Sequence, residues 1–347
     1  MDSHYLSALA HVFRVAINKL RFVNPLNAGE EKKQFFSSTT YNPQFVYPPL
    51  TYHRERIDKE LALLESYEGF EKDILQAFVK RARVHLSLKD AVGTENFSQI
   101  SKDVFGDVDP KIIPLAQELA RRSVVCEEKT LKASHVRVLF DAHLPADWKA
   151  TLSFRTSAKI VLSQEQCQLI IDPEALFSEH DVERLLVHEV GAHISRGLRH
   201  ADLSPKFLQY LFLDYSETEE GLAVYLEELE GVQDPWQQKI YALRFLGTVF
   251  AETHSFRETY DYLLSFGIDV DEAYRLTQRL KRGLIDTAKP GAFYREKIYL
   301  QGSLAVKAYV ASTPDPHATV KFLLAGKFGL ADIPLLESYA KNNNFYK

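Results

Sequence analysis

The sequence of 347 residues contains only two cysteines, one methionine and two tryptophans. The two cysteines, Cys126 and Cys167, are too few for a disulfide framework, and neither belongs to a C-x-x-C pair of the kind that binds zinc. We therefore expect two buried thiols in a reducing compartment, which favours a cytoplasmic location.

The sequence also lacks long apolar runs and an excess of basic charge. No apolar run approaches the roughly 20 residues that span a bilayer, so no membrane span is expected. From Tyr5 to Leu20 apolar residues recur at helical spacing, which predicts an amphipathic helix and not a signal peptide. The formal net charge is −5, so no overall basic field favours a nucleic-acid partner.

The residues before 122 are expected to pack on the remainder as an N-terminal part, residues 1–121. Residues 22–52 are rich in Pro, Asn and aromatic residues and show little periodicity, which predicts an extended strap. Residues 54–120 repeat apolar side chains at helical spacing, for example Ile57, Leu61 and Leu64. This part is therefore predicted to be a strap followed by helices.

Residues 122–347 are expected to form the main unit, with a sheet at 122–172 and helices at 178–230 and 234–347. The segments 135–140, 159–162 and 168–171 are apolar and β-branched, as strands are. Ser178 precedes Asp181 by three residues, which predicts a capped helix start. Fewer residues fall in strands than in helices, so the fold class is α+β and mostly helical.

The most informative segment reads HEVGAH and contains His188, Glu189 and His193; Glu220 follows in the segment TEEGLA. Two imidazoles and one carboxylate are the ligand set of a catalytic zinc site, which leaves a fourth position for water. Glu189, next to a ligand, is placed like the general base of H-E-x-x-H peptidases. The alternative is a chance pair among twelve histidines, each packed in the core.

The spacing of the two histidines differs from the H-E-x-x-H pattern. Residues i and i+4 lie about 40° apart around a regular helix, whereas residues i and i+5 lie about 140° apart. His188 and His193 can share one metal only if the helix is distorted between them. A π-type turn would add the extra residue, and Gly191 makes such a distortion less costly.

The second segment is predicted to begin a helix. Ser216 and Glu219 have the spacing of a capping box, with Ser216 as the N-cap residue. Glu219 would then serve the cap, which leaves Glu220 free to bind the metal. A sheet, a motif helix and then a helix with a glutamate ligand is the order found in gluzincin-like zinc peptidases, with the site in a cleft beside the sheet edge.

These motifs resemble those of the microtubule-associated tyrosine carboxypeptidase family, whose bacterial relatives are often labelled by a Q-E-G-L-A motif. Similar blocks extend over most of the chain: Asn24–Glu31, Phe35–Phe36, Tyr41–Tyr47, Lys281–Gly283, Asp286–Thr287, Pro290–Phe293 and Tyr299–Gly302. The resemblance implies one zinc ion per chain, with His188, His193 and Glu220 as ligands and Glu189 as the catalytic glutamate. Glu219 stands where bacterial members often have Gln, at a position that is not a ligand.

The resemblance implies a zinc carboxypeptidase that acts on the C-terminus of a peptide or protein and removes a residue such as tyrosine. Such an enzyme needs a hydrogen-bond donor for the oxyanion, and Tyr299 is the candidate; its alternative role is that of a buried aromatic. It also needs a cation for the substrate carboxylate. Lys281 and Arg282 are the first candidates, unless they merely end a helix, and Arg155 is a weaker one.

Two other classes of function stay open at this point. A zinc endopeptidase would have the same metal site without a cation for the terminal carboxylate. A non-catalytic regulator could retain the peptidase scaffold, although the complete set of His188, Glu189, His193 and Glu220 argues against it. Cleavage of peptides with free and amidated C-termini distinguishes the first two classes.

Overall fold

The computed structural model describes residues 1–17, 22–69, 71–124, 126–154 and 158–343 and is mostly helical, with two small sheets. The helices before residue 145 are α1 (Ser3–Ile17), α2 (Ala28–Ser37), α3 (Arg54–Glu65), α4 (Lys72–Asp90), α5 (Phe97–Phe105), η1 (Pro110–Ile112), α6 (Ile113–Arg121) and α7 (Ala133–Asp141). The strands are β1 (Leu131–Lys132), β2 (Lys149–Leu152), β3 (Ile160–Ser163), β4 (Gln168–Ile171) and β5 (Leu176–Phe177).

The helices that follow the strands contain the two sequence motifs. They are α8 (Glu179–Leu185), η2 (Leu186–Ile194), α9 (Ser195–Ala201), η3 (Lys206–Tyr210), α10 (Ser216–Leu229), α11 (Pro235–Ala251), α12 (Phe256–Leu264), α13 (Val270–Lys281), η4 (Tyr294–Lys297), α14 (Ile298–Ala311), α15 (Pro316–Leu323), η5 (Leu330–Asp332) and α16 (Ile333–Asn343). The predicted α+β class with a predominance of helix is confirmed.

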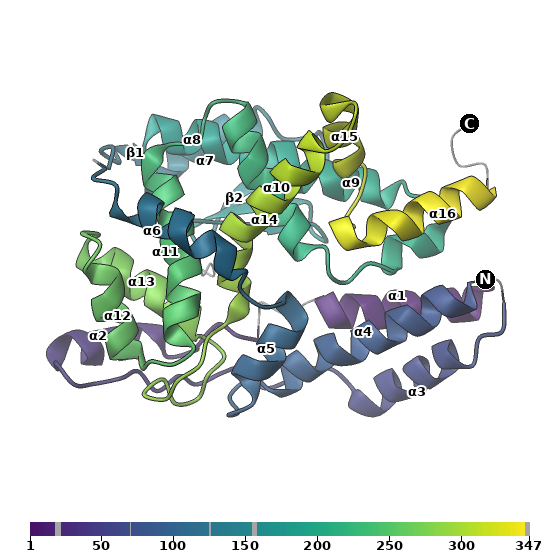
Figure 1. Cartoon of the computed structure of the whole chain (residues 1–347), viewed down its shortest axis with the longest axis horizontal. Coiled ribbons are helices and arrows are strands. Elements are labelled where there is room, and N and C mark those ends of the chain that lie inside the picture. Colours follow the sequence, from purple (N-terminus) through teal and green to yellow (C-terminus); the bar gives the residue numbers. More distant parts are fainter. Residues whose placement is uncertain (18–21, 70, 125, 155–157, 344–347) are drawn as a thin grey trace.

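Helices α10 and α14 cross the middle of the molecule between two hydrophobic cores (Figure 1). The first core contains α5, α6 and α11–α13, and the second contains α1, α3, α4 and the C-terminal helices. Val224 of α10 belongs to the first core, whereas Leu222 and Leu226 belong to the second. Because α10 is buried on both sides, the position of Glu220 is fixed from two directions.

The α10–α14 crossing depends on two glycines. A Cβ atom at Gly221 would lie 2.2 Å from the backbone carbon of Gly302, and one at Gly302 would lie 2.3 Å from the carbonyl oxygen of Glu217. Neither position has room for a side chain, so the two backbones touch directly. The crossing thereby fixes the start of α10 against α14, the helix that carries Tyr299.

The larger sheet has the order β2-β4-β3, with β2 parallel and β3 antiparallel to β4, and β1 pairs with β5 in a separate two-stranded sheet. The predicted strands at 159–162 and 168–171 correspond to β3 and β4. Directly after β3, the Nε2 amide of Gln164 donates to the carbonyl oxygen of His193 at 3.1 Å. The sheet therefore ends against the helix that carries the motif.

The prediction of a strand at 135–140 is wrong, because these residues lie within α7. Ala133, Val136 and Phe140 are fully buried while Val138 is 55% exposed. Burial therefore recurs every three to four residues, which is the helical period, and the β-branched composition misled the interpretation. The strand before β3 is instead β2, which the sequence analysis did not predict.

Two further expectations need correction in detail. The segment 22–52 is not extended throughout, because α2 occupies Ala28–Ser37, where Glu30 and Glu31 lie in the favourable first turn. Cys126 is exposed and Cys167 is half-buried, so the thiols are not both buried. The helices predicted over 54–120 are confirmed by α3–α6, and α1 confirms the N-terminal helix as far as residue 17; Leu20 lies outside the described residues.

Helices α1, α3 and α4 share their core with residues far along the chain, among them Ala192, Val306 and Phe328. Figure 1 shows α1 and α4 side by side, with α16 nearby. Within the parts of the chain described above, no helix is both long and apolar enough to cross a membrane.

Candidate metal centre

The helix that carries the first motif is a π-helix over Leu186–Ile194, continuous with α8 before it and α9 after it. This confirms the prediction drawn from the i,i+5 spacing of His188 and His193. The wider turn brings the two imidazoles together, with ring centroids 4.8 Å apart. Ser178 begins the preceding helix with the predicted capping box to Asp181.

Three ligand atoms converge at this point from two helices. Nε2 of His188 lies 3.6 Å from Oε2 of Glu220, and Nε2 of His193 lies 3.7 Å from the same oxygen. Three atoms that each bind one zinc ion at 2.0–2.2 Å in a tetrahedral arrangement would lie about 3.4 Å apart. The cluster is thus close to the size that such an ion requires, and no other set of this kind occurs in the described part of the chain.

The surroundings of the Glu220 carboxylate indicate whether a cation fits between the three ligand atoms. Its side chain is 9% exposed, and its Oε2 atom has no hydrogen-bond partner among the described residues. A buried carboxylate oxygen without a partner is costly. Because this oxygen faces the Nε2 atoms of His188 and His193, a metal ion bound between the three would satisfy it.

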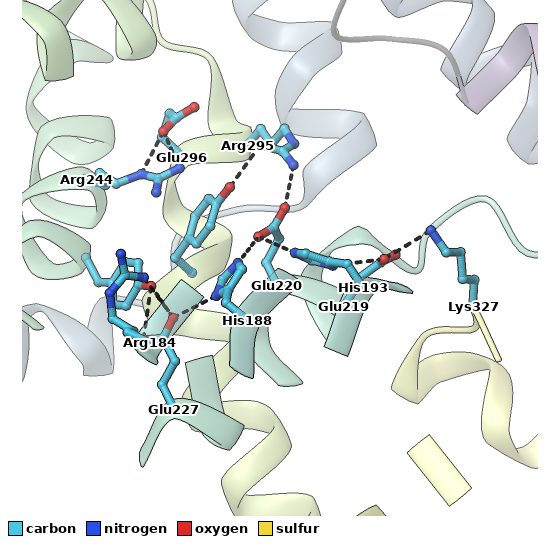
Figure 2. A network of polar contacts seen from close by, with 12 residues as sticks. Arg184, His188, His193, Glu219, Glu220, Glu227, Arg244, Arg295, Glu296 and Lys327 are labelled. Carbon is cyan, nitrogen blue, oxygen red and sulfur yellow. Dashed lines mark hydrogen bonds and ion pairs between the residues drawn. The ribbon is translucent and has the colours of Figure 1, made fainter. Parts of the chain in front are cut away.

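Each histidine is oriented by a second carboxylate, as Figure 2 shows. Nδ1 of His188 lies 2.7 Å from Oε1 of Glu227, and Nδ1 of His193 lies 3.0 Å from Oε1 of Glu219. A proton on Nδ1 leaves Nε2 with a free lone pair, so both rings could offer that atom to a metal ion. Carboxylates in this position also raise the basicity of the ligand.

Each of the three carboxylates, those of Glu219, Glu220 and Glu227, is paired with a cationic side chain. Arg184 Nη1 donates to Glu227 at 3.1 Å, Lys327 Nζ lies 3.1 Å from Glu219, and Arg295 Nη2 donates to Glu220 Oε1 at 2.6 Å. These groups balance the negative charge of a site that is nearly inaccessible to solvent. The three cations come from different elements: Arg184 lies in α8, Arg295 in η4 and Lys327 in the segment before η5 (Figure 2).

The pKa values of the ligands also fit a cation site. Burial acts to lower the pKa of His188, but Glu220 and Glu227 raise it, to about 9. Burial acts to raise the pKa of Glu220, but Arg295 and the two histidines hold it well below its usual value. The carboxylates thus favour a positive charge at the imidazoles. A metal ion bound at Nε2 would provide this charge in place of protons.

The predicted capping box at the start of α10 is wrong. The helix begins at Ser216, with Tyr215 as the N-cap residue and no side-chain cap. Glu219 is therefore not used by a cap and contacts His193 instead. Glu189, the proposed base, is half-buried beside His188, and its carboxylate forms no hydrogen bond or ion pair with the described residues.

Tyr299, the candidate donor, lies next to this cluster. Its hydroxyl accepts a hydrogen bond from Arg295 Nη1 at 3.2 Å, so its own proton stays available. The Arg244 guanidinium covers its ring at 3.4 Å from the centroid. Burial acts to raise the pKa of Tyr299, yet this pKa is lowered from 10.0 because Arg295, Arg244 and Arg279 stabilise the phenolate.

The two cations first considered for the substrate are engaged within the protein. Lys281 is fully buried, and its ammonium donates to the carbonyls of Ala251, His254 and Lys289. Arg282 donates to Glu296 Oε1 at 2.9 Å and to Asn24. These contacts favour structural roles for both. Arg155 lies outside the described residues.

Several residues of the site were not identified from the sequence. Glu227 follows Glu220 by seven residues, two helical turns along one face of α10, and this spacing was a usable signal. Arg295 precedes Tyr299 by four residues, but it lies in η4 and not in α14, so no simple helical pattern identified it. Lys327 belongs to a distant segment, and only the fold brings it to Glu219.

The fold and the site define an α+β protein, mostly helical, in which two histidines and one glutamate lie close enough together to hold a metal ion. The family model described as microtubule-associated tyrosine carboxypeptidase matches residues 33–345. The chain belongs to this family.

Curated relatives match at modest identity. The putative tyrosine carboxypeptidase MATCAP2 of Mus musculus is 24% identical over 94% of this chain and 57% of its own length. The microtubule-associated tyrosine carboxypeptidase 1 of Mus musculus is 23% identical over 93% of this chain and 62% of its own length. Over 48% of this chain, the identity to the putative tyrosine carboxypeptidase MATCAP2 of Homo sapiens is 30%. The chain thus spans about six tenths of the length of the two mouse relatives.

Proposed function

We propose that this protein is a zinc-dependent carboxypeptidase that hydrolyses the last peptide bond of a peptide or protein. The observation that carries the proposal is the convergence of His188 Nε2, His193 Nε2 and Glu220 Oε2, an oxygen without a hydrogen-bond partner among the described residues. Two histidines and a carboxylate are the donor set of catalytic zinc sites. The names of the relatives support carboxypeptidase action and tyrosine as a residue that is removed.

When bound, the zinc ion would polarise the scissile carbonyl and acidify an attacking water molecule. Glu189 is the base that takes the proton from this water, because it adjoins a ligand and its carboxylate forms no hydrogen bond or ion pair with the described residues. The same carboxyl group then returns the proton to the leaving amine. Tyr299 donates a hydrogen bond, through its hydroxyl proton, to the oxygen on which negative charge develops.

The gluzincin-like arrangement is part of this proposal. The end of the small sheet touches the motif helix through Gln164 and the carbonyl of His193, which is compatible with an extended substrate along the sheet. A cytoplasmic place of action is also proposed, because a relative is named as microtubule-associated.

Mass spectrometry of a peptide library after incubation with the zinc-loaded protein tests the function. We expect loss of a single C-terminal residue from peptides with a free carboxylate, abolished by a chelator and restored by zinc. Cleavage inside amidated peptides would identify an endopeptidase instead. No cleavage by a protein that retains zinc would contradict both enzymatic functions.

A further inference from the structure

We propose that the guanidinium group of Arg279 binds the terminal carboxylate of the substrate. The inference rests on the proposed carboxypeptidase function and names the subsite that this function requires. Arg279 belongs to a cluster of four arginines around the carboxylate of Glu296. They come from α11, from α13 and the residue that follows it, and from η4. The cluster consists of Arg244, Arg279, Arg282 and Arg295.

Glu296 is fully buried and receives three of the four guanidinium groups directly. Arg244 Nε donates to Oε2 at 2.8 Å, Arg279 Nε donates to the same oxygen at 2.9 Å, and Arg282 Nη2 donates to Oε1 at 2.9 Å. Arg295 is its neighbour in the sequence and contacts Glu220 instead. Figure 2 shows Arg244 and Arg295 on the same side of the metal ligands, with Glu296 between them.

The cluster carries more positive than negative charge. Four guanidinium groups face two carboxylates, Glu296 and Glu220, among the contacts of the described residues. Glu220 would also share its charge with a bound metal ion. Buried charge without a counterion is costly. Burial and neighbouring arginines lower the pKa values of Arg279 and Arg282 despite Glu296, whereas carboxylate partners help to raise those of Arg244 and Arg295. An anionic ligand would restore the balance.

Arg279 has the donors that such a ligand needs. Its Nε atom is fixed by Glu296, whereas its two terminal nitrogens donate to no described residue. Its side chain is 17% exposed, more than those of Arg244 and Arg282 at 8% each. Because Glu296 holds the guanidinium of Arg279 at Nε, its two terminal nitrogens are fixed in position and free to donate. They can form two parallel hydrogen bonds to the two oxygens of a carboxylate.

The cluster adjoins the reacting centre through Tyr299. Arg295 links the phenol to Glu220, since Nη1 contacts the hydroxyl and Nη2 contacts the carboxylate. Arg244 covers the ring of the same tyrosine. A terminal residue bound beside Tyr299 would therefore place its carboxylate toward the arginines and its amide bond toward the metal ligands.

The test measures binding separately from turnover. In a Glu189→Gln background, which keeps peptides intact, fluorescence anisotropy gives the affinity for a labelled peptide that ends in tyrosine, with either a free or an amidated C-terminus. We expect the free form to bind at least about tenfold more tightly. Arg279→Gln should abolish most of this preference, and Arg279→Lys should retain part of it.

Arg275→Gln is the matched control. Arg275 lies one turn earlier on α13, is 50% exposed and pairs with Glu272, so this variant should keep the full preference. Thermal unfolding of each variant verifies the fold. An unchanged preference in folded Arg279→Gln, or equal losses for both peptides, would overturn the subsite.

The experiments distinguish a failure of the carboxylate subsite from a failure of the proposed function. If the unaltered zinc protein releases a terminal residue but Arg279→Gln keeps the preference for the free carboxylate, the function stands and the subsite is wrong. If no residue is released while the preference still depends on Arg279, the carboxylate site stands and the function is wrong.

Discussion

Glu219 and Glu220 contact opposite edges of the same imidazole. Nδ1 of His193 lies 3.0 Å from Glu219 Oε1, and its Nε2 lies 3.7 Å from Glu220 Oε2. Consecutive residues in a first helical turn point in different directions, about 100° apart. The pair therefore divides two roles between neighbours: Glu219 holds the ring, and Glu220 is available to the metal.

The first prediction concerns the carboxylates behind the histidines. Glu219→Gln and Glu227→Gln should each weaken zinc binding about 10- to 100-fold, because an amide holds the ring less firmly and makes it less basic. Competition with a chromophoric chelator measures the affinity. Glu228→Gln is the control, because Glu228 is exposed on the same helix and pairs with Lys307. Equal affinities in all three variants would contradict the orienting role.

The second prediction separates the base from the ligand. Glu189→Gln should retain the fold and about one zinc ion per chain but lose turnover by roughly 10²–10⁴-fold, because the proton acceptor is removed. Glu220→Gln should instead weaken metal binding. Elemental analysis and the rate of peptide hydrolysis provide the two measurements. If both variants lost zinc equally, the division of roles between the two glutamates would be incorrect.

Much of this centre could be predicted because its chemistry is local in the sequence. The spacing of His188 and His193 required a distorted helix, and the π-helix is present. The capping box at Ser216 failed because the spacing of serine and glutamate does not reveal whether a distant histidine competes for the carboxylate. Tertiary contacts thus overrode a local preference.

The cations could not be predicted in the same way. Lys281 and Arg282 were chosen because they lie in a motif, whereas the open guanidinium belongs to Arg279, two residues before the end of α13. The direction of a side chain at a helix end depends on what packs there, and Glu296 comes from a separate element. Similarly, burial at Ala133, Val136 and Phe140 makes α7 a helix despite its strand-like composition.

The third prediction concerns the α10–α14 crossing. Gly302→Ala should lower the free energy of unfolding by about 1–3 kcal/mol, because the new methyl group would meet the carbonyl of Glu217 and force the helices apart. Chemical denaturation measures the change. Gly29→Ala is the control, since nothing lies within 4 Å of a Cβ atom there and alanine favours α2. Equal effects of both substitutions would show that the close approach is unimportant.

The fourth prediction concerns pH and the segment that carries Lys327. Nδ1 of His200 accepts from the backbone N–H of Lys327 at 3.1 Å, while Nε2 donates to the carbonyl of Gln209 at 2.9 Å. Only a neutral imidazole can do both. Burial, aided by the charges of Lys327 and Arg196, accordingly lowers the pKa of His200 from 6.5 to about 4.

The sign of the effect follows from the depressed pKa. The unfolded chain binds a proton at His200 that the folded chain excludes, so this contribution to stability is complete above about pH 6.5 and is lost as the pH falls toward 4. At about 1.4 kcal/mol per pKa unit, it amounts to roughly 3 kcal/mol at most. His200→Gln should remove that part of the pH dependence, whereas His4→Gln, at an exposed position, should not. Denaturation curves between pH 4 and 8 provide the measurement, and parallel profiles for His200→Gln and the unaltered protein would show that His200 is not the group responsible.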